Sequence, residues 1–349
     1  MKKCLKTFVV IIAFAVFLTS VMTGCKMSFD DEDTESEEIG QESKAENLST
    51  RKAKVSVIQY MNYTALNECC DGIKQSLENA DIEYEINVGS DSSPEQDCEE
   101  IAQNIAINGG YDLVITIGTP SSISVYSSIS TASKIPVIFC AVTDPVGANL
   151  VVSNQTPTNN CTGISTAFDI KEQLNMINTF QPSITKLGVI YTKDEQNTAQ
   201  QVKTLKSEAK KLNITIYEGA VESSSELKEV AAEMVPEVDA ITLLPDNMVS
   251  ANSWDIVNQA IIGNKPVYGV TQSEVKEGCI AGYCYDFTEL GRKTGETAAA
   301  VLRGQSAANT PVEIVSDCTL YVNTDVVENL YIDIPESYSN AEKVKTSYE

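Results

Sequence analysis

The sequence predicts an α/β protein with two doubly wound parallel-sheet lobes joined by a hinge. From residue 54 onward, short apolar runs alternate with longer segments of helical pattern, which is typical of a parallel sheet covered by helices. The same plan of alternation occurs twice. Because the 349-residue chain is too long for one compact core, each series is expected to form a lobe of its own.

The first series runs from residue 55 to residue 142. Its expected strands are 55–60, 82–88, 112–117 and 136–142, and its expected helices are 65–79, 94–108 and 121–133. Loops after the strands should meet at the carboxyl edge of the sheet, where doubly wound folds bind ligands.

The second series repeats this plan and is followed by extra material. Its expected helices are 170–180, 198–212, 224–234 and 251–263, and its expected strands are 187–191, 214–221, 239–244 and 266–269. A strand at 280–285, a helix at 288–303 and an extended run at 312–322 follow. This material allows three crossings between lobes. The expected division is 53–165 plus 283–308 for the first lobe, 166–282 plus 309–338 for the second, and 339–349 for a tail.

The first 25 residues are typical of a bacterial lipoprotein export signal. Three lysines precede an apolar run at 8–18, and Met22-Thr23-Gly24-Cys25 follows. The apolar run is too short to span a bilayer. We expect a signal peptide at 1–24, cleaved after Gly24, and a lipid on Cys25 that holds the protein at the extracytoplasmic face of the cell membrane. An ordinary secretory signal with an incidental cysteine is the alternative.

Residues 25–52 are expected to form an acidic, disordered tether. Between residues 26 and 50 there are nine acidic and two basic residues, with few apolar ones, so the segment repels itself and stays solvated. It would space the folded part from the membrane, although a disordered remnant would behave similarly. The formal net charge of the whole chain is -24, which argues against nucleic acid and anionic lipid surfaces as partners.

The chain has ten cysteines and no histidine. Eight cysteines remain beyond Cys4 and Cys25, an even number that in an exported protein could form disulfides. Several, such as Cys140 in an apolar strand, are interpreted instead as small core residues. No CxxC motif occurs, so no metal site is expected. The absence of histidine removes the commonest general base, and we expect neither an enzyme nor a cofactor.

Five segments between residues 54 and 335 carry a family resemblance in their order and spacing. They are Ile58-Gln59-Tyr60 with Ala65-Leu66, Gly118-Thr119-Pro120, Ala141-Val142-Thr143-Asp144-Pro145-Val146-Gly147, Pro245-Asp246-Asn247, and Tyr285-Asp286 with Leu290-Gly291-Arg292. In these segments the chain resembles the extracellular solute-binding proteins of ABC transporters, in the type I periplasmic-binding fold. The branch is the one whose ligands include tryptophan and other aromatic amino acids.

The resemblance implies an amino acid-like ligand, such as tryptophan, phenylalanine or tyrosine, that is held between two lobes and delivered to an ABC permease. The chain departs from the family in the first cleft loop. Members often have His, Pro and Asp where this chain has Tyr63, Thr64 and Asn67. These differences leave the identity of the ligand open.

The loop at 118–122 is a candidate site for a ligand carboxylate. It joins an apolar strand to a helix, so its backbone N–H groups lack partners and carry partial positive charge. Thr119, Pro120 and Ser121 are the candidate ligand residues there, although Ser121 could equally cap the helix.

The loop that follows the next strand contains Asp144-Pro145. A carboxylate at this place could accept an α-ammonium group in a charge-assisted hydrogen bond worth about 1.5 to 3 kcal/mol. The alternatives are a turn that needs Asp before Pro for backbone reasons, and a role in the path to the second lobe.

The end of the first strand and the loop after it supply further candidates. They are Gln59, Tyr60, Tyr63, Thr64 and Ala65. Tyrosines in a cleft offer flat apolar faces that suit an aromatic ligand. Tyr60 could instead pack within its own lobe.

Five candidates come from the second lobe and the return crossing: Asn197, Asp246, Asn247, Tyr285 and Asp286. Asn197, Asp246, Asn247 and Asp286 come after expected strands, and Tyr285 ends one. Asn197 and Asp286 could instead be helix caps, and Asp246 or Asn247 could form an Asx turn. Trp254 lies on an expected helix and is interpreted as structural.

The leading hypothesis is therefore a lipid-anchored solute-binding component of an ABC importer. The same pair of lobes could alternatively present a small molecule to a membrane sensor or receptor. An extracellular enzyme using Asp144 or Asp246 lacks a partner base and nucleophile.

Overall fold

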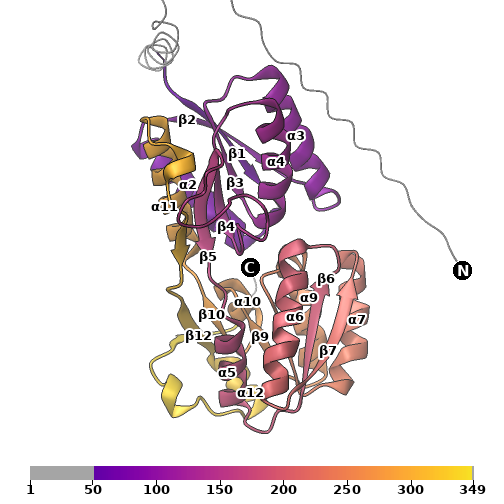
Figure 1. Cartoon of the computed structure of the whole chain (residues 1–349). Helices are drawn as coiled ribbons and strands as arrows, with labels where there is room; N and C mark the ends of the chain where they lie inside the picture. The colour runs from indigo at the N-terminus through magenta and orange to yellow at the C-terminus, as the bar shows by residue number, and fades with distance from the viewer. Residues whose placement is uncertain (1–50, 348–349) are drawn as a thin grey trace, which may run out of the picture. The chain divides into compact units, whose positions relative to one another are not determined.

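The computed structural model describes residues 51–347 and contains two sheets, each with helices on both faces (Figure 1). This confirms the predicted α/β fold class with two lobes. The predicted signal peptide at 1–24, the lipid site Cys25 and nearly all of the predicted tether lie outside the described residues. Within 51–347, no helix has the length and apolar character needed to cross a bilayer.

The first sheet has the strand order β11-β5-β4-β3-β1-β2, and every neighbouring pair is parallel. In the register, Val57 of β1 lies between Ile86 of β2 and Ile115 of β3. The strands of this sheet are β1 Lys54–Gln59, β2 Glu83–Val88, β3 Leu113–Ile117, β4 Val137–Val142, β5 Cys161–Thr166 and β11 Glu313–Val315.

Two pairs of helices cover the first sheet. Val57 of β1 belongs to the core cluster under α2 and α11, whereas its neighbour Ile58 belongs to the cluster under α3 and α4. Successive side chains of a strand point to opposite faces, so both faces need apolar residues. This explains the nearly continuous apolar runs of the sequence. The four helices are α2 Thr64–Asn79, α3 Pro94–Asn108, α4 Thr119–Ala132 and α11 Phe287–Leu302.

The second sheet has the order β13-β12-β10-β9-β8-β6-β7, with one antiparallel pair, β10 and β12. Its strands are β6 Lys186–Thr192, β7 Thr215–Val221, β8 Ala240–Thr242, β9 Val267–Gly269, β10 Ala281–Cys284, β12 Thr319–Asn323 and β13 Glu342–Val344.

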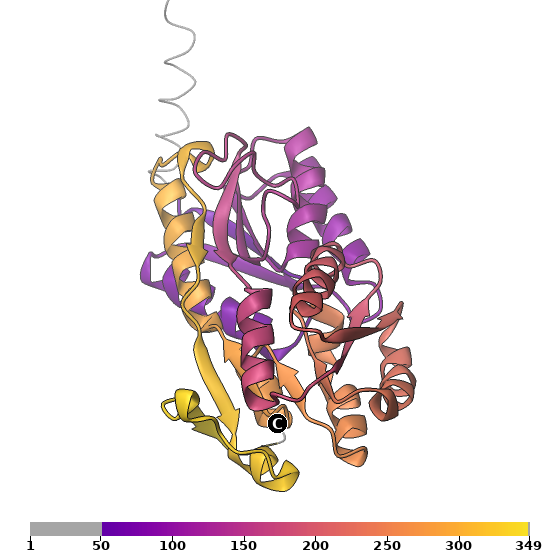
Figure 2. The same cartoon turned by 60° about the horizontal axis from the view of Figure 1, so that its bottom comes forward.

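Helices α5, α6 and α12 pack on one face of the second sheet, and α7, α9 and α10 pack on the other (Figures 1 and 2). The helices of this lobe are α5 Ile170–Phe180, α6 Gln196–Lys211, α7 Leu227–Met234, α8 Asn247–Ala251, α9 Ser253–Ile262, α10 Gln272–Glu277 and α12 Thr324–Leu330. Short 3-10 turns are η1 Ser224–Glu226, η2 Val235–Glu237, η3 Ala307–Asn309 and η4 Glu336–Tyr338.

The chain passes between the two sheets three times. It crosses at 167–169 between β5 and α5, at 285–286 between β10 and α11, and at 316–318 between β11 and β12. Three connecting segments between two lobes form the kind of hinge that permits closure around a ligand.

Several segments differ from the sequence-based expectation, including α8 and α10, neither of which was predicted. Strand β5 was not predicted, because Cys161-Thr162-Gly163-Ile164-Ser165-Thr166 is rich in polar and small residues, although all six are buried. The extended run at 312–322 is two strands in different sheets. Consequently β11, expected in the second lobe, pairs with β5 in the first, and β13, expected in a tail, pairs with β12.

The cysteines of the described part are free thiols. Seven of the eight are buried, and Cys140 is fully inaccessible on β4. This agrees with their interpretation as small core residues.

Helices α2 and α11 lie side by side (Figure 1) and approach so closely that glycine is required at their contact. A Cβ atom on Gly72 would overlap the carbonyl oxygen of Thr288, and one on Gly291 would overlap the carbonyl oxygen of Cys69. Because both obstacles are backbone atoms, a larger residue could be accepted only if the helices moved apart.

We expect Gly291→Ala to lower the free energy of unfolding by about 2 kcal/mol, the usual cost of overpacking a tight contact. The measurement is urea denaturation followed by circular dichroism. Ser207→Ala, on an exposed position of α6, is the control and should change stability by less than about 0.5 kcal/mol. Equal effects of the two substitutions would contradict the packing argument.

Candidate ligand-binding site

Two connected cavities lie between the lobes. The outer cavity has a volume of about 1090 Å³ and is lined by the loop after β4, the crossing at 167–169, and helices α5 and α6. The inner cavity is smaller, about 50 Å³, and lies deeper between the lobes. Thr119, Thr143, Phe168 and Asn197 line both. These residues therefore form the neck that joins the two spaces.

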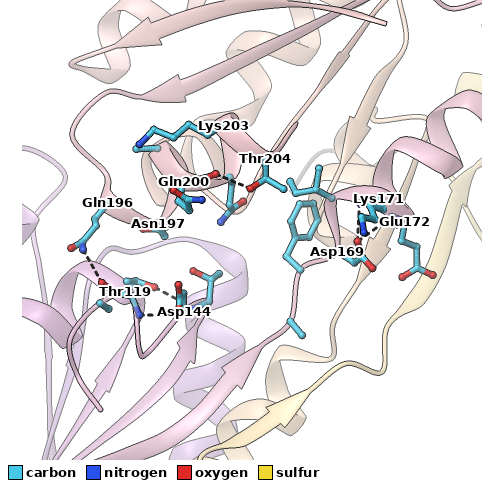
Figure 3. A pocket seen from close by; sticks show the side chains of 18 of the residues that line it. Thr119, Asp144, Asp169, Lys171, Glu172, Gln196, Asn197, Gln200, Lys203 and Thr204 are labelled. Carbon is cyan, nitrogen blue, oxygen red and sulfur yellow. Dashed lines mark hydrogen bonds between the residues drawn. The ribbon is translucent and has the colours of Figure 1, made fainter. Parts of the chain in front are cut away.

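The side chains of the outer cavity are mostly polar. In Figure 3, Asn197, Gln200, Lys203 and Thr204 project from α6, while Thr119 and Asp144 face them from the first lobe. Asp169, Lys171 and Glu172 lie at the start of α5, which closes one side. This space is wide enough to admit a small solute to the neck.

The inner cavity has an aromatic wall. Tyr63, Phe168, Tyr285 and Phe287 contribute to it from different parts of the chain, including two of the crossings. Flat apolar rings around a few polar groups are typical of a site that recognises an aromatic or bulky apolar group. Burial raises the pKa of Tyr285 well above its ordinary range, so this ring stays neutral.

Helix α4 begins at the neck. Its first residue is Thr119, and the preceding Gly118 has φ 99°, a left-handed conformation that favours glycine. A Cβ atom on Gly118 would also lie 3.4 Å from Cβ of Tyr60 and 3.6 Å from Oδ1 of Asn247. These are ordinary van der Waals distances, so it is the backbone conformation of Gly118 that calls for glycine. The helix therefore begins beside the second lobe, where its N–H groups can bind an anion.

A buried carboxylate organises the second-lobe side of the cleft. Glu195 accepts hydrogen bonds from the backbone N–H of Asn247 at 3.0 Å, from Asn247 Nδ2 at 2.7 Å and from Asn197 Nδ2 at 3.0 Å. Asn197 Nδ2 also donates to the carbonyl of Pro245 at 2.8 Å. The orientation of both amide side chains is therefore fixed by acceptors within their own lobe.

Asp246 is committed to its own lobe in the same way. It is the N-cap of α8, and its carboxylate accepts from the N–H of Val249 at 3.0 Å and from the N–H and hydroxyl of Thr192, both at 2.7 Å. The Asx-type cap left open by the sequence is thus present. Asp246 lines the inner cavity, but its carboxyl oxygens accept hydrogen bonds from these donors of its own lobe.

Two hydrogen bonds join the lobes across the cleft. The Tyr63 hydroxyl donates to Asn247 Oδ1 at 3.0 Å, and Gln196 Nε2 donates to the Gly147 carbonyl at 3.2 Å. Residues from both lobes therefore touch directly beside the two cavities, as expected of a closed arrangement.

The structure brings about half of the predicted site residues to these cavities. Those that line one or both are Tyr63, Thr119, Asp144, Asn197, Asp246, Asn247 and Tyr285. The predicted residues that line neither are Gln59, Tyr60, Thr64, Ala65, Pro120, Ser121, Pro145 and Asp286.

The second group is directed elsewhere for identifiable reasons. Gln59 donates to the Met61 carbonyl and to Asn67, and the Ser121 hydroxyl donates to carbonyls of its own helix start. Asp286 caps α11 by accepting from the N–H of Glu289 at 2.9 Å. Tyr60 lines a separate open groove beside α3.

Sequence reasoning missed several residues of the site. They are Thr143, Thr166, Phe168, Glu195, Gln196, Gln200, Gln201, Ser250, Thr271 and Phe287. Phe168 follows β5, so predicting that strand would have placed it at a sheet edge. Glu195 comes shortly after β6, and this position could likewise have placed it at a sheet edge.

Three buried carboxyl groups of the second lobe have raised pKa values. Burial, followed by the charge of Asp246, raises the pKa of Glu195 to about 8, against the effect of its amide donors. Burial raises the pKa of Asp246 as well. Glu274, whose carboxylate accepts from the N–H groups of Val270 and Thr271, has its pKa raised to about 7, mainly by burial.

The family model for ABC transporter substrate binding proteins matches residues 54–345. The chain belongs to this family. Its members bind solutes and are not enzymes. Among residues 51–347 there is also no group of three Cys, Asp or Glu side chains placed to hold a metal ion.

Relatives of known description share the family. A tyrosine-binding protein of Clostridioides difficile (strain R20291) is 30% identical over 332 residues, which cover 93% of this chain and 92% of the relative. A Vibrio cholerae conserved domain protein of known structure is 27% identical, with a TM-score of 0.79, over 85% of this chain and 100% of the other.

Two further structures relate the lobe arrangement to ligand. An ABC domain from Streptococcus pneumonia in complex with L-Trp is 29% identical, with a TM-score of 0.79, over 84% of this chain and 100% of the other. A ligand-free, open substrate-binding protein with adhesive properties from Clostridium difficile is 27% identical over the same shares of the two chains, with a TM-score of 0.64. By TM-score, the structure of the present chain is therefore more similar to the complex with L-Trp than to the ligand-free, open form.

The raised pKa of Glu274 predicts a pH dependence of stability. A carboxyl whose pKa is about 7 in the fold and 4.5 otherwise stabilises the fold while protonated, and this contribution is lost as pH rises toward and through 7. Between about pH 5.5 and pH 8.5, ionisation of Glu274 should lower the unfolding free energy of the wild type by about 2 kcal/mol. We expect this part of the decrease to be absent in Glu274→Gln. Urea denaturation at both pH values measures it.

Glu229→Gln, on an exposed position of α7, is the matched control. It should leave the difference between the two pH values as in the wild type. If Glu274→Gln behaves like Glu229→Gln, Glu274 is ionised in the fold throughout this range.

Proposed function

We propose that the chain is the lipid-anchored solute-binding component of an ABC importer, and that it binds an aromatic amino acid between its lobes. The observation that supports this most strongly is the aromatic inner cavity, which meets the start of α4 at a polar neck. A relative that is named for tyrosine and a structural neighbour that holds L-Trp are consistent with such a ligand.

The arrangement assigns the parts of the ligand to different surfaces. The ring would enter the inner cavity among Tyr63, Phe168, Tyr285 and Phe287, where stacked and edge-to-face contacts are favourable. The carboxylate would lie at the neck, beside the Thr119 hydroxyl and the first N–H groups of α4. The inner cavity, at about 50 Å³, is too small for an aromatic ring in the present arrangement. We therefore expect the lobes to open for entry and to close around the ligand less far than in this structure.

Delivery to a permease would follow from this closure. A ligand that contacts both lobes stabilises the closed state, and a membrane partner can distinguish closed from open lobes. A lipid on Cys25 would keep the protein near that partner, while the acidic segment after it would leave the lobes free to turn.

Isothermal titration against L-tyrosine, L-tryptophan and L-phenylalanine tests the ligand class. We expect saturable one-to-one binding of at least one of them, and no binding of L-lysine or L-glutamate, whose charged side chains would be desolvated in the inner cavity. Folded protein that binds none of the three aromatic amino acids would refute the proposal.

Phe168→Ala should weaken binding of the preferred amino acid at least about tenfold, because truncation of a buried aromatic contact costs more than 1 kcal/mol. Tyr331→Ala provides a matched control, since that ring is 94% exposed. It should leave the dissociation constant unchanged. An unaffected Phe168 variant would place the ring of the ligand outside the inner cavity.

The membrane anchor is tested by Cys25→Ser. We expect this variant to lose incorporation of labelled fatty acid and to move from the membrane fraction to the medium, because the thiol is the site of lipid attachment. Cys4→Ser lies within the predicted signal and should remain lipid-labelled. Retention of label by the Cys25 variant would show that the anchor is elsewhere.

A further inference from the structure

Two buried polar atoms at the neck stand out because the protein itself does not use them. Thr143 Oγ1 and Asn197 Oδ1 are shielded from solvent, and neither has a hydrogen-bond partner among residues 51–347. Both residues line both cavities. Thr143 comes from the first lobe, just after β4, and Asn197 from the second, at the start of α6. An unpaired buried oxygen costs about 1 to 3 kcal/mol unless a ligand satisfies it.

The two atoms can accept hydrogen bonds. Asn197 Nδ2 points to Glu195 and to the Pro245 carbonyl, so Oδ1 is the free end of that amide and can only accept. If the amide were flipped, Oδ1 would face the Glu195 carboxyl oxygen and the Pro245 carbonyl oxygen, which are both acceptors. These two groups therefore fix the orientation of the amide. The Thr143 hydroxyl offers two further lone pairs.

Thr119, the first residue of α4, lies beside Thr143. The backbone N–H of Thr143 lies 3.5 Å from Thr119 Oγ1, so Thr143 adjoins the helix start that can bind a carboxylate, and Asn197 lines the same two cavities as Thr119. An α-amino acid carries an ammonium and a carboxylate on the same carbon atom and would present both groups to this neck.

From this geometry we infer that Thr143 Oγ1 and Asn197 Oδ1 together bind the α-ammonium of the ligand, one from each lobe, and that Glu195 is the positioning residue that fixes the Asn197 amide. The inference rests on the proposed function. It replaces Asp144, which is exposed, lines the outer cavity and accepts from the N–H of Gly147 at 2.9 Å. Because the acceptors lie on opposite lobes, ammonium binding would itself favour closure.

The test compares each amino acid with the analogue that lacks the ammonium. The pairs are L-tyrosine with 3-(4-hydroxyphenyl)propionate, L-tryptophan with indole-3-propionate and L-phenylalanine with 3-phenylpropionate, measured by isothermal titration on the full mature protein. Wild type should prefer the amino acid of the better-bound pair by at least about tenfold, since a hydrogen bond to a charged group is worth about 1.5 to 3 kcal/mol.

Thr143→Val is the decisive variant, because it keeps the shape of the side chain and removes a hydroxyl that has no partner among residues 51–347. It should lower the preference about tenfold or more while changing the affinity for the analogue by less than about threefold. Glu195→Gln should also lower the preference. Both asparagine Nδ2 groups donate to one oxygen of Glu195, and the amide NH2 that replaces the other oxygen would face the Asn247 N–H, a second donor, at about the present 3.1 Å. Asp144→Asn should leave the preference unchanged.

The outcomes separate the two proposals. If wild type binds none of the three aromatic amino acids, the proposed function fails and this inference fails with it. If wild type binds one but Thr143→Val keeps the full preference, the inference alone is wrong. The inference is also wrong if Asp144→Asn abolishes the preference. It is wrong for Glu195 if Glu195→Gln weakens the binding of amino acid and analogue equally, because that result indicates a merely structural role for Glu195. Should Glu195→Gln not fold, Thr143→Val and Asn197→Leu decide by the same ratio.

Discussion

The site depends on one constraint, which is that parallel strands place their following loops at a common edge of the sheet. Thr119 follows β3, Thr143 follows β4, Phe168 follows β5, Asn197 follows β6 and Asp246 follows β8. Residues far apart in the chain are thereby gathered at the edges of two sheets. The three crossings turn those edges toward each other, so the cavities are a consequence of topology before they are a consequence of any single side chain.

Within that arrangement of strands, buried carboxyl groups give the second lobe its detailed shape. Glu195 and Asp246 are nearly inaccessible and close enough for each to influence the other. Burying carboxyl groups is costly unless donors satisfy them, and here the donors are the amides and N–H groups that form the cleft. The same hydrogen bonds that make the buried acids tolerable hold Asn197 and Asn247 in one orientation. Rigidity of the second-lobe surface is therefore linked to the burial of Glu195.

The first lobe achieves precision through close backbone approach. Gly72 and Gly291 allow α11, which arrives after the second crossing, to dock on α2 of the same lobe. That contact fixes where Tyr285 and Phe287 enter the inner cavity. Gly118 contributes in a different way, through the positive φ with which α4 begins at the neck. In both places glycine sets the position of residues that would contact a ligand.

The sequence by itself determined the α/β class, the two repeated series and the family, because alternation of apolar runs and motif order are local properties of the chain. It also singled out Thr119, Asn197 and Asn247, since each follows a well-defined strand. Only the tertiary structure decided which candidates reach the cavity. The Ser121 hydroxyl donates to carbonyls just before its helix, and Asp286 caps α11. Phe168 becomes a cleft residue through a crossing after a polar strand that carries no apolar pattern, whereas Thr143, directly after a predicted strand, is distinguished only by a hydroxyl without a partner among residues 51–347. The direction of a side chain depends on partners distant in sequence, and these become neighbours only when both sheets have formed.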